Sequence, residues 1–377
     1  MYFSNLKKDL EALKNGSRGI EEINRQQINL SDHARSILLQ DMDVFFHQLN
    51  IEPGSGVIDS AVINHIFCNF WKDADASVYL SCEKKREQLD GILSGLEKSR
   101  RKQAIAPLIE DHRKNIEEQV RRDLSKRGTS FSIRVNKKNL ENLGRETFPD
   151  WNENLKKPTL GLYCDKVGNY LKAVIEEYAR KPYFEREAIF CRETLLTIQK
   201  AIRRGAMLKI TTRRRYVQYV KPYTVRGDTE QLYHYLAGYL SYGSEENWRP
   251  GSIRLSSITD CEMLWDFSDM DAEQKAELEA SIRKKGIQFL SDMAQRELPQ
   301  KIVVKFTEEG KGMYHRMLHL RPMYSGRPEE LVYEFFCTQR QIENYFFKFG
   351  HNVKILEPQE LADKFLRRYE SAVKQYK

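Results

Sequence analysis

The 377-residue sequence lacks the patterns that mark several classes of protein. Its six cysteines form no CxxC pair, which argues against a zinc ribbon and a disulfide framework and fits a reducing compartment. No run approaches the ~18 apolar residues that a membrane span needs. The charged N-terminal segment also lacks the apolar core of a signal peptide. We therefore expect a cytoplasmic protein with no membrane partner.

Motifs of catalysis are missing as well. The sequence contains no GxxxxGK[ST] phosphate loop and no GxSxG nucleophile elbow. His315 and His319 stand four residues apart on an expected helix, which is a metal-ligand spacing, but no HExxH glutamate or third ligand accompanies them. We expect no enzymatic activity, no metal and no cofactor.

Charge is what the sequence has in excess. Charged residues make up 31% of the chain, the net charge is +8 and the pI is near 9.0. Clustered Lys and Arg gain affinity for nucleic acids by releasing counterions from phosphates, so a polyanion partner is one interpretation. A solvated basic surface is the other. The length suits two or three domains of ~100–200 residues each.

One order of elements, strand, helix, turn and helix, occurs twice in the first half of the chain. Ser31 is a favourable N-cap after the first short strand, and Asn136 takes the same place after the second. Neither strand can pair alone, so we expect them to pair with each other. The expected elements are a strand at 27–30 with helices at 32–49 and 57–71, and a strand at 131–135 with helices at 137–143 and 163–180.

This order resembles the ribbon-helix-helix fold, with one chain supplying both copies. Pairing of 26–30 with 130–136 would bury Ile28, Leu30, Phe131, Ile133 and Val135. Strand alternation then places five polar residues on the outer face, namely Arg25, Gln27, Asn29, Ser132 and Arg134. In ribbon-helix-helix proteins that face reads the major groove of DNA. The alternative is that these side chains only solvate the ribbon.

A charged, helical insertion at 77–127 separates the two copies. It carries two basic clusters, but interleaved Glu and Asp favour a solvated helical surface. The expected N-terminal domain therefore spans 1–181, and a linker helix at 182–205 follows it.

The segment from Val217 to Ile258 reads as antiparallel strands joined by polar turns. It resembles a WYL domain, with the family's signature at His234-Tyr235-Leu236, a proline-aromatic pair at Pro222-Tyr223 and a closing pair at Arg254-Leu255. His234 replaces the signature tryptophan. The resemblance implies an Sm-like β-barrel at 206–268 that senses ligands or nucleic acid in bacterial defence regulators.

Cations that hold phosphates and planar groups that stack on unpaired bases are both present in this segment. Arg254 is the strongest single candidate, although it could instead form a salt bridge to Asp228 or Asp260. Tyr235 could be plain core, and the arginine run could be a solvated hairpin edge. The candidate contacts are Arg213, Arg214, Arg215, Lys221, Tyr223, His234, Tyr235, Arg254 and Ser256.

The last part of the chain is expected to hold a connecting helix at 269–298 and an α+β cap, of ferredoxin-like type, at 299–377. The cap resembles the C-terminal extension of many WYL proteins, which implies a dimer contact. The motif that carries this resemblance is Gly350, Val353, Leu356 and Pro358. An aromatic group could be core or interface, and core is favoured; it consists of Tyr345, Phe346, Phe347 and Phe349.

As a whole, this multi-domain α+β chain resembles the WYL accessory proteins of type VI-D CRISPR systems. That resemblance implies a homodimer that binds single-stranded RNA and enhances cleavage by an RNA-guided effector ribonuclease. The Arg-x4-His pattern of the effector's own active site is absent around every histidine. The alternative function is a transcriptional regulator, with the ribbon on duplex operator DNA and the barrel as ligand sensor.

Overall fold

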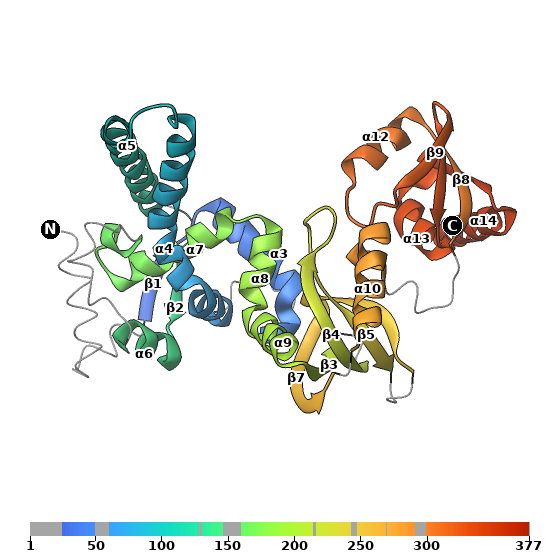
Figure 1. The fold of residues 1–377 in the computed structure, drawn as a ribbon, viewed down its shortest axis with the longest axis horizontal. Helices are drawn as coiled ribbons and strands as arrows, with labels where there is room; N and C mark the ends of the chain where they lie inside the picture. Colours follow the sequence, from blue (N-terminus) through green and yellow to red (C-terminus); the bar gives the residue numbers. More distant parts are fainter. Residues whose placement is uncertain are drawn as a thin grey trace. The chain divides into compact units, whose positions relative to one another are not determined.

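A computed structural model describes residues 25–49, 60–126, 128, 130–145, 160–213, 216–242, 247–268, 270–290 and 299–376. The chain divides into two compact units, residues 1–192 and residues 193–377, which are described in turn (Figure 1). Within the described ranges, no helix is long and apolar enough to cross a membrane.

A two-stranded antiparallel ribbon lies in the first unit. Strand β1 (Arg25–Asn29) pairs with β2 (Ser130–Arg134), and Gln27 lies opposite Ser132. The predicted pairing of these distant segments is confirmed. Four of the five apolar residues predicted beneath the ribbon are buried, and the side chain of Phe131 lies outside the described set. The buried four are Ile28, Leu30, Ile133 and Val135.

Helices follow both strands in the predicted order. The predicted end of the second helix at Trp71 is wrong, because that helix continues to Ile92 as one arm of a charged helical hairpin. The hairpin has a small apolar core made by Cys82, Ile105 and Ile109, which explains why this charged insertion folds. The helices are α3 (Asp32–Leu49), α4 (Ser60–Ile92), α5 (Lys98–Ser125), α6 (Lys137–Arg145) and α7 (Val167–Arg180), with a short 3-10 turn η2 (Leu160–Tyr163) before α7.

The two copies are joined by reciprocal polar contacts. Ser31 caps α3 through the backbone N–H of Ala34 (3.1 Å), and its own N–H and hydroxyl donate to the carboxylate of Glu176 on α7 (2.7 and 2.8 Å). Asn136 caps α6 through the N–H of Asn139 (2.8 Å), and its own N–H donates to Oδ1 of Asn64 on α4 (2.9 Å). Each second helix thus holds the start of the other copy's first helix.

The predicted single linker helix is two helices. Helix α8 (Tyr183–Phe190) ends at Cys191, and α9 (Arg192–Arg204) follows. The break allows α8 to pack within the first unit, where the rings of Phe190 and Phe45 stack at 4.5 Å and Arg186 pairs with Asp41 at 2.8 Å.

The second unit begins with a five-stranded antiparallel sheet in the order β6-β5-β4-β3-β7. β5 crosses β4 so closely at Gly238 that a Cβ there would lie 2.1 Å from the carbonyl oxygen of Lys221, so glycine is required. The predicted closing strand ends at Arg254, and Leu255 begins the 3-10 turn η3 (Leu255–Ser257). The strands are β3 (Ala206–Thr212), β4 (Val217–Gly227), β5 (His234–Tyr242), β6 (Arg249–Arg254) and β7 (Ile258–Phe267).

Helix α10 (Ala272–Lys285) follows the sheet and begins with a capping box between Asp271 and Gln274. The predicted helix at 269–298 is interrupted, because Gly286 adopts φ +88° and ends α10. A short turn, η4 (Ile287–Phe289), comes next, and residues 291–298 lie outside the described ranges.

The C-terminal part forms a four-stranded antiparallel sheet in the order β11-β8-β10-β9. The element order β-α-β-β-α-β, followed by a last helix, is that of the ferredoxin-like fold. Strand β9 was not predicted from the sequence. Tyr345, Phe346 and Phe349 are buried in the aromatic core, as favoured, whereas Phe347 is only partly buried. The elements are β8 (Gln300–Phe306), α12 (Glu308–Arg316), β9 (Tyr324–Glu329), β10 (Val332–Cys337), α13 (Gln339–Phe346), β11 (Val353–Glu357) and α14 (Gln359–Lys374).

Candidate nucleic-acid interface

The outer face of the ribbon carries the residues predicted for it. Arg25 lies opposite Arg134, and Gln27 lies opposite Ser132; all four are exposed. Neither arginine has an ion-pair partner among the described residues. Asn29 lies at the end of this face and is half-buried. The face therefore presents two free cations flanking two small hydrogen-bonding groups.

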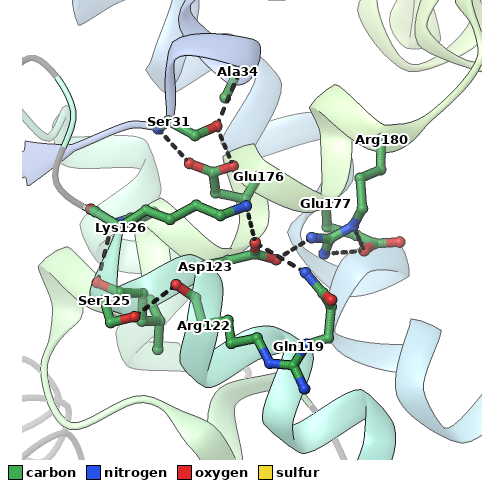
Figure 2. Close-up of polar contacts among 12 residues, drawn as sticks. Ser31, Ala34, Gln119, Arg122, Asp123, Ser125, Lys126, Glu176, Glu177 and Arg180 are labelled. Atoms are coloured by element: carbon green, nitrogen blue, oxygen red, sulfur yellow. Dashed lines mark hydrogen bonds and ion pairs between the residues drawn. The ribbon is translucent and has the colours of Figure 1, made fainter.

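The ribbon is fixed from beneath by one stripe of α7. Lys172, Glu176 and Arg180 recur every four residues and each contacts a different segment; Figure 2 shows the contacts of Glu176 and Arg180. Nζ of Lys172 donates to the carbonyl oxygens of Leu124 (3.0 Å) and Lys126 (2.9 Å), at the end of α5 where carbonyls lack the partners that a continuing helix would supply. Glu176 holds the start of α3 at Ser31.

Arg180 completes the stripe by pairing with buried Asp123 on α5. Burial raises the pKa of Asp123, whereas the hydrogen bond from Lys126, the charge of Arg180 and the amide of Gln119 lower it (Figure 2). The lowering effects are together the larger, so the pKa of Asp123 lies below its usual value. The inserted hairpin is thus attached to the ribbon-bearing core by ionic contacts.

Arg254 is the best-placed cation of the second unit. Its Nε donates to Oγ of Ser256 at 2.8 Å, and its guanidinium lies over the ring of Tyr233 at 4.2 Å. Neither Asp228 nor Asp260 pairs with it, and no other described carboxylate does. Its charge is therefore held in a fixed orientation without being neutralised.

The cap places further groups around this arginine. The ring of His319 lies 4.5 Å from that of Tyr233. Burial, together with the charges of Arg254 and Lys348, lowers the pKa of His319 to about 4, so the ring is neutral at pH 7. Arg321 pairs with Glu230 at 3.0 Å. A neutral ring and a tyrosine thus stand beside a cation, a combination suited to an unpaired base with its phosphate.

Other predicted barrel residues have structural partners. Arg213 donates from its side chain to the carbonyl oxygen of Ser256 at 3.0 Å, and the buried Ser256 in turn orients Arg254. Nζ of Lys221 lies 4.9 Å from the ring centre of Trp248. Arg214 and Arg215 lie outside the described residues.

The signature aromatics face α10 and η4. The hydroxyl of Tyr223 donates to Glu279 at 3.1 Å. Tyr235 is buried in a cluster with Ala237 and Leu290, so it belongs to the core, which is the alternative that the sequence left open. His234 begins β5 opposite Gly227 and is half-buried. Among the described members of the predicted set, hydrogen bonds link Arg213, Ser256 and Arg254, and Tyr235 lies opposite Arg254 in the sheet with its side chain in the core.

Two residues beside Arg254 were not predicted from the sequence as site residues. Tyr233 precedes the signature and could have been found by strand alternation, because it shares a face with Tyr235. His319 was placed on a helix with His315, but α12 ends at Arg316, so the two histidines do not share a helical face. In the described part of the chain, no group of three His, Cys, Asp or Glu side chains could hold a metal ion.

Comparison with solved structures shows one likeness over nearly the whole chain. A crystal structure described as a CRISPR Cas-related protein has 21% sequence identity and a TM-score of 0.63, with 93% of this chain and 94% of that chain covered. At this identity the likeness shows a shared fold.

A second likeness is too weak to support an argument. The proteasome accessory factor B/C of Arthrobacter aurescens has 14% identity and a TM-score of 0.26, covering 66% of this chain and 37% of that one. No protein-family model and no curated protein matches the sequence.

Proposed function

We propose that this chain is a non-catalytic accessory protein that binds single-stranded RNA and enhances the ribonuclease activity of a type VI-D CRISPR effector. The observation that carries the proposal is Arg254, a cation with no described carboxylate partner that is held against Tyr233 beside the neutral ring of His319. Planar side chains and a fixed cation recognise an unpaired base and its phosphate, whereas a paired base offers no free face.

The link to CRISPR systems has two supports. The sequence resembles the type VI-D accessory proteins along most of its length, and its fold is shared with a CRISPR Cas-related protein. In this proposal the first unit is a ribbon-helix-helix domain, the five-stranded sheet is a WYL barrel, and the cap joins two copies into a homodimer.

Substitution of Arg254 tests RNA binding. We expect Arg254→Gln to weaken binding of a single-stranded RNA by about 1–3 kcal/mol at fixed salt, since stacking and a phosphate contact are both lost. The thermal midpoint should stay close to that of the wild type because Arg254 is half-exposed and its partners are Tyr233 and Ser256. Lys84→Gln, an exposed cation of α4, is the matched control. Equal RNA affinity in the wild type and the Arg254 variant would refute the assignment.

The ribbon favours a second function, a DNA-binding regulator. Arg25, Gln27, Ser132 and Arg134 form an exposed polar face on a paired antiparallel ribbon, an arrangement that can enter a major groove. A double variant, Ser132→Ala/Arg134→Ala, should abolish operator binding under this function. Under the leading proposal it should leave the enhancement of the effector ribonuclease mostly intact.

A further inference from the structure

A cavity of about 360 Å³ lies in the first unit where the ribbon, the end of α5 and the start of α7 meet. Side chains of the ribbon's outer face, Gln27 and Asn29, reach its wall. The inserted hairpin supplies Lys126, and α7 with the residue before it supplies Lys172 and Lys166. Its volume lies within the ~300–1,000 Å³ range of small-ligand sites.

Three lysines line this cavity, and they differ in what already holds their ammonium groups. Lys172 is 2% exposed and uses two of its three N–H donors on backbone carbonyls, which leaves one. Lys126 is paired with Asp123 at 2.9 Å. Lys166 is exposed at the start of α7 and has no ion-pair partner among the described residues.

The nearby carboxylates are already engaged. Asp123 accepts from Lys126, Gln119 and Arg180, and Glu176 accepts from Ser31 (Figure 2). Asp165 accepts from Asn169, which also lines the cavity. Within the described residues neither Lys166 nor Lys172 forms an ion pair with these acids, and the start of α7 adds the partial positive charge of a helix N-terminus.

One of the residues that line the cavity, Asn29, has a polar atom without a partner. Oδ1 of Asn29 is buried and has no hydrogen-bond partner within the described chain. An unpaired buried acceptor is costly, so such atoms usually meet a donor from a ligand or from water. Gln27, on the same strand face, offers both a donor and an acceptor.

We propose that this cavity, the ribbon pocket, binds one unpaired nucleotide of a single strand, with its phosphate on Lys166 and Lys172 and its base edge on Asn29 and Gln27. The nucleic-acid part rests on the proposed function. The new part of the proposal is the role of the inserted hairpin, which encloses the end of the ribbon and so forms a site for one nucleotide. A paired base in a duplex cannot enter such a site without leaving its partner strand.

Lys166→Glu tests the phosphate contact with little risk to folding, since an acidic residue at a helix N-terminus is favourable. The probe is a fluorescein-labelled oligouridylate measured by fluorescence anisotropy at fixed salt. We expect at least a ~10-fold loss of affinity and a shallower salt dependence. Lys84→Glu changes the charge equally at an exposed site outside the pocket and should shift affinity less than ~2-fold. Equal losses in both variants would overturn the pocket.

Asn29→Ala tests the base contact. It should weaken oligouridylate binding but leave unchanged the affinity for an oligomer of abasic ribose phosphates, which offers no base edge. An equal loss with both oligomers, or no loss with either, would contradict the assignment. Circular dichroism melts of each variant show whether the fold is kept.

Two further experiments distinguish a nucleotide within an RNA strand from a free nucleotide. They also distinguish failure of the ribbon pocket from failure of the proposed function. With 4-thiouridine in the strand, ultraviolet crosslinks should fall in peptides that contain residues 25–29 or 166–172. Crosslinks confined to the second unit would overturn the ribbon pocket yet keep the proposed function. If the wild type binds no RNA, the proposed function fails. Binding of uridine monophosphate, measured by calorimetry and abolished by Lys166→Glu, would then assign the ribbon pocket to a free nucleotide. If uridine monophosphate does not bind either, the ribbon pocket is refuted.

Discussion

The two compact units differ in where they keep charge and where they keep aromatic rings. Six charged side chains are buried in the described part of the first unit, but Asp228 is the only one in that of the second. Among the described residues, the large aromatic side chains that are exposed all belong to the second unit; they are Tyr216, Trp265, Phe267, Tyr324, Phe336 and Tyr376.

This difference assigns distinct tasks to the units. In the first, ionic contacts such as Arg186 with Asp41 and Arg180 with Asp123 join segments far apart in sequence and hold the ribbon and the inserted hairpin in one arrangement. In the second, aromatic packing builds the cap around Phe346 and leaves other rings at the surface for contacts. The first unit is thus the more sensitive to loss of a charge, and the second to changes at its surface.

The largest expected effect is the loss of a buried charge in the first unit. Asp41→Leu would leave the guanidinium of Arg186 uncompensated, and we expect a loss of about 3–5 kcal/mol in the free energy of unfolding, measured in urea. The double variant Asp41→Leu/Arg186→Leu removes both charges and should recover most of that loss. If the double variant is as unstable as the single one, the pair is not what stabilises this site.

The second largest expected effect is on dimer affinity, when a charge is introduced at an exposed position of the cap. Phe336 is 65% exposed, while its neighbour Phe335 is buried in the core. In the proposed homodimer, we expect Phe336→Asp to weaken self-association at least ~10-fold, or about 1.4 kcal/mol, in light scattering. Leu366→Asp, on α14 and 57% exposed, is the matched control and should leave the dimer intact. If the dimer persists in Phe336→Asp, the contact between the two copies does not involve Phe336.

Acid should act on the first unit through Asp123. Its pKa is lowered in the folded state, so the ionised form stabilises the fold above the unfolded value of ~3.9, and this stability is lost as pH falls through the lower folded value. Between about pH 5 and about pH 2, the wild type should lose more stability than Asp123→Asn. Parallel pH profiles of urea midpoints would contradict this.

The smallest effect concerns His319 in the second unit. Its pKa is lowered to about 4 from the ordinary 6.5, so protonation favours the unfolded chain. Stability is therefore complete above about pH 6.5 and falls as pH drops toward about 4. The thermal midpoint of the wild type should decrease slightly more over this window than that of His319→Gln. An identical decrease in both proteins would show that the ring is already solvated.

Local signals in the sequence predicted much of the fold. Caps at Ser31 and Asn136 and strand alternation predicted the ribbon, its two segments and its outer face, while the register came from the structure. β9 was missed because its sequence, Tyr324 to Glu329, is polar, contains Gly and Pro and is mostly exposed, so only pairing with β10 makes it a strand. The break at Cys191 was missed for a similar reason, since the packing of α8 decides it.

The candidate sites were less predictable because their geometry depends on distant residues. Arg254 was singled out from the sequence as a candidate, yet its partner Tyr233 and the neighbouring His319 come from a turn and from another sheet's loop. The contacts of Glu176 and Lys172 join residues that are 145 and 46 positions apart. No spacing rule in the sequence reaches that far.

The most direct test of the central claim is a filter-binding competition between single-stranded RNA and random duplex DNA at one fixed salt concentration, because affinities at different salt cannot be compared. We predict that wild-type protein retains the single-stranded RNA in excess and that Arg254→Gln reduces this retention. Stronger retention of the duplex by the wild type would contradict the account and favour the DNA-binding regulator.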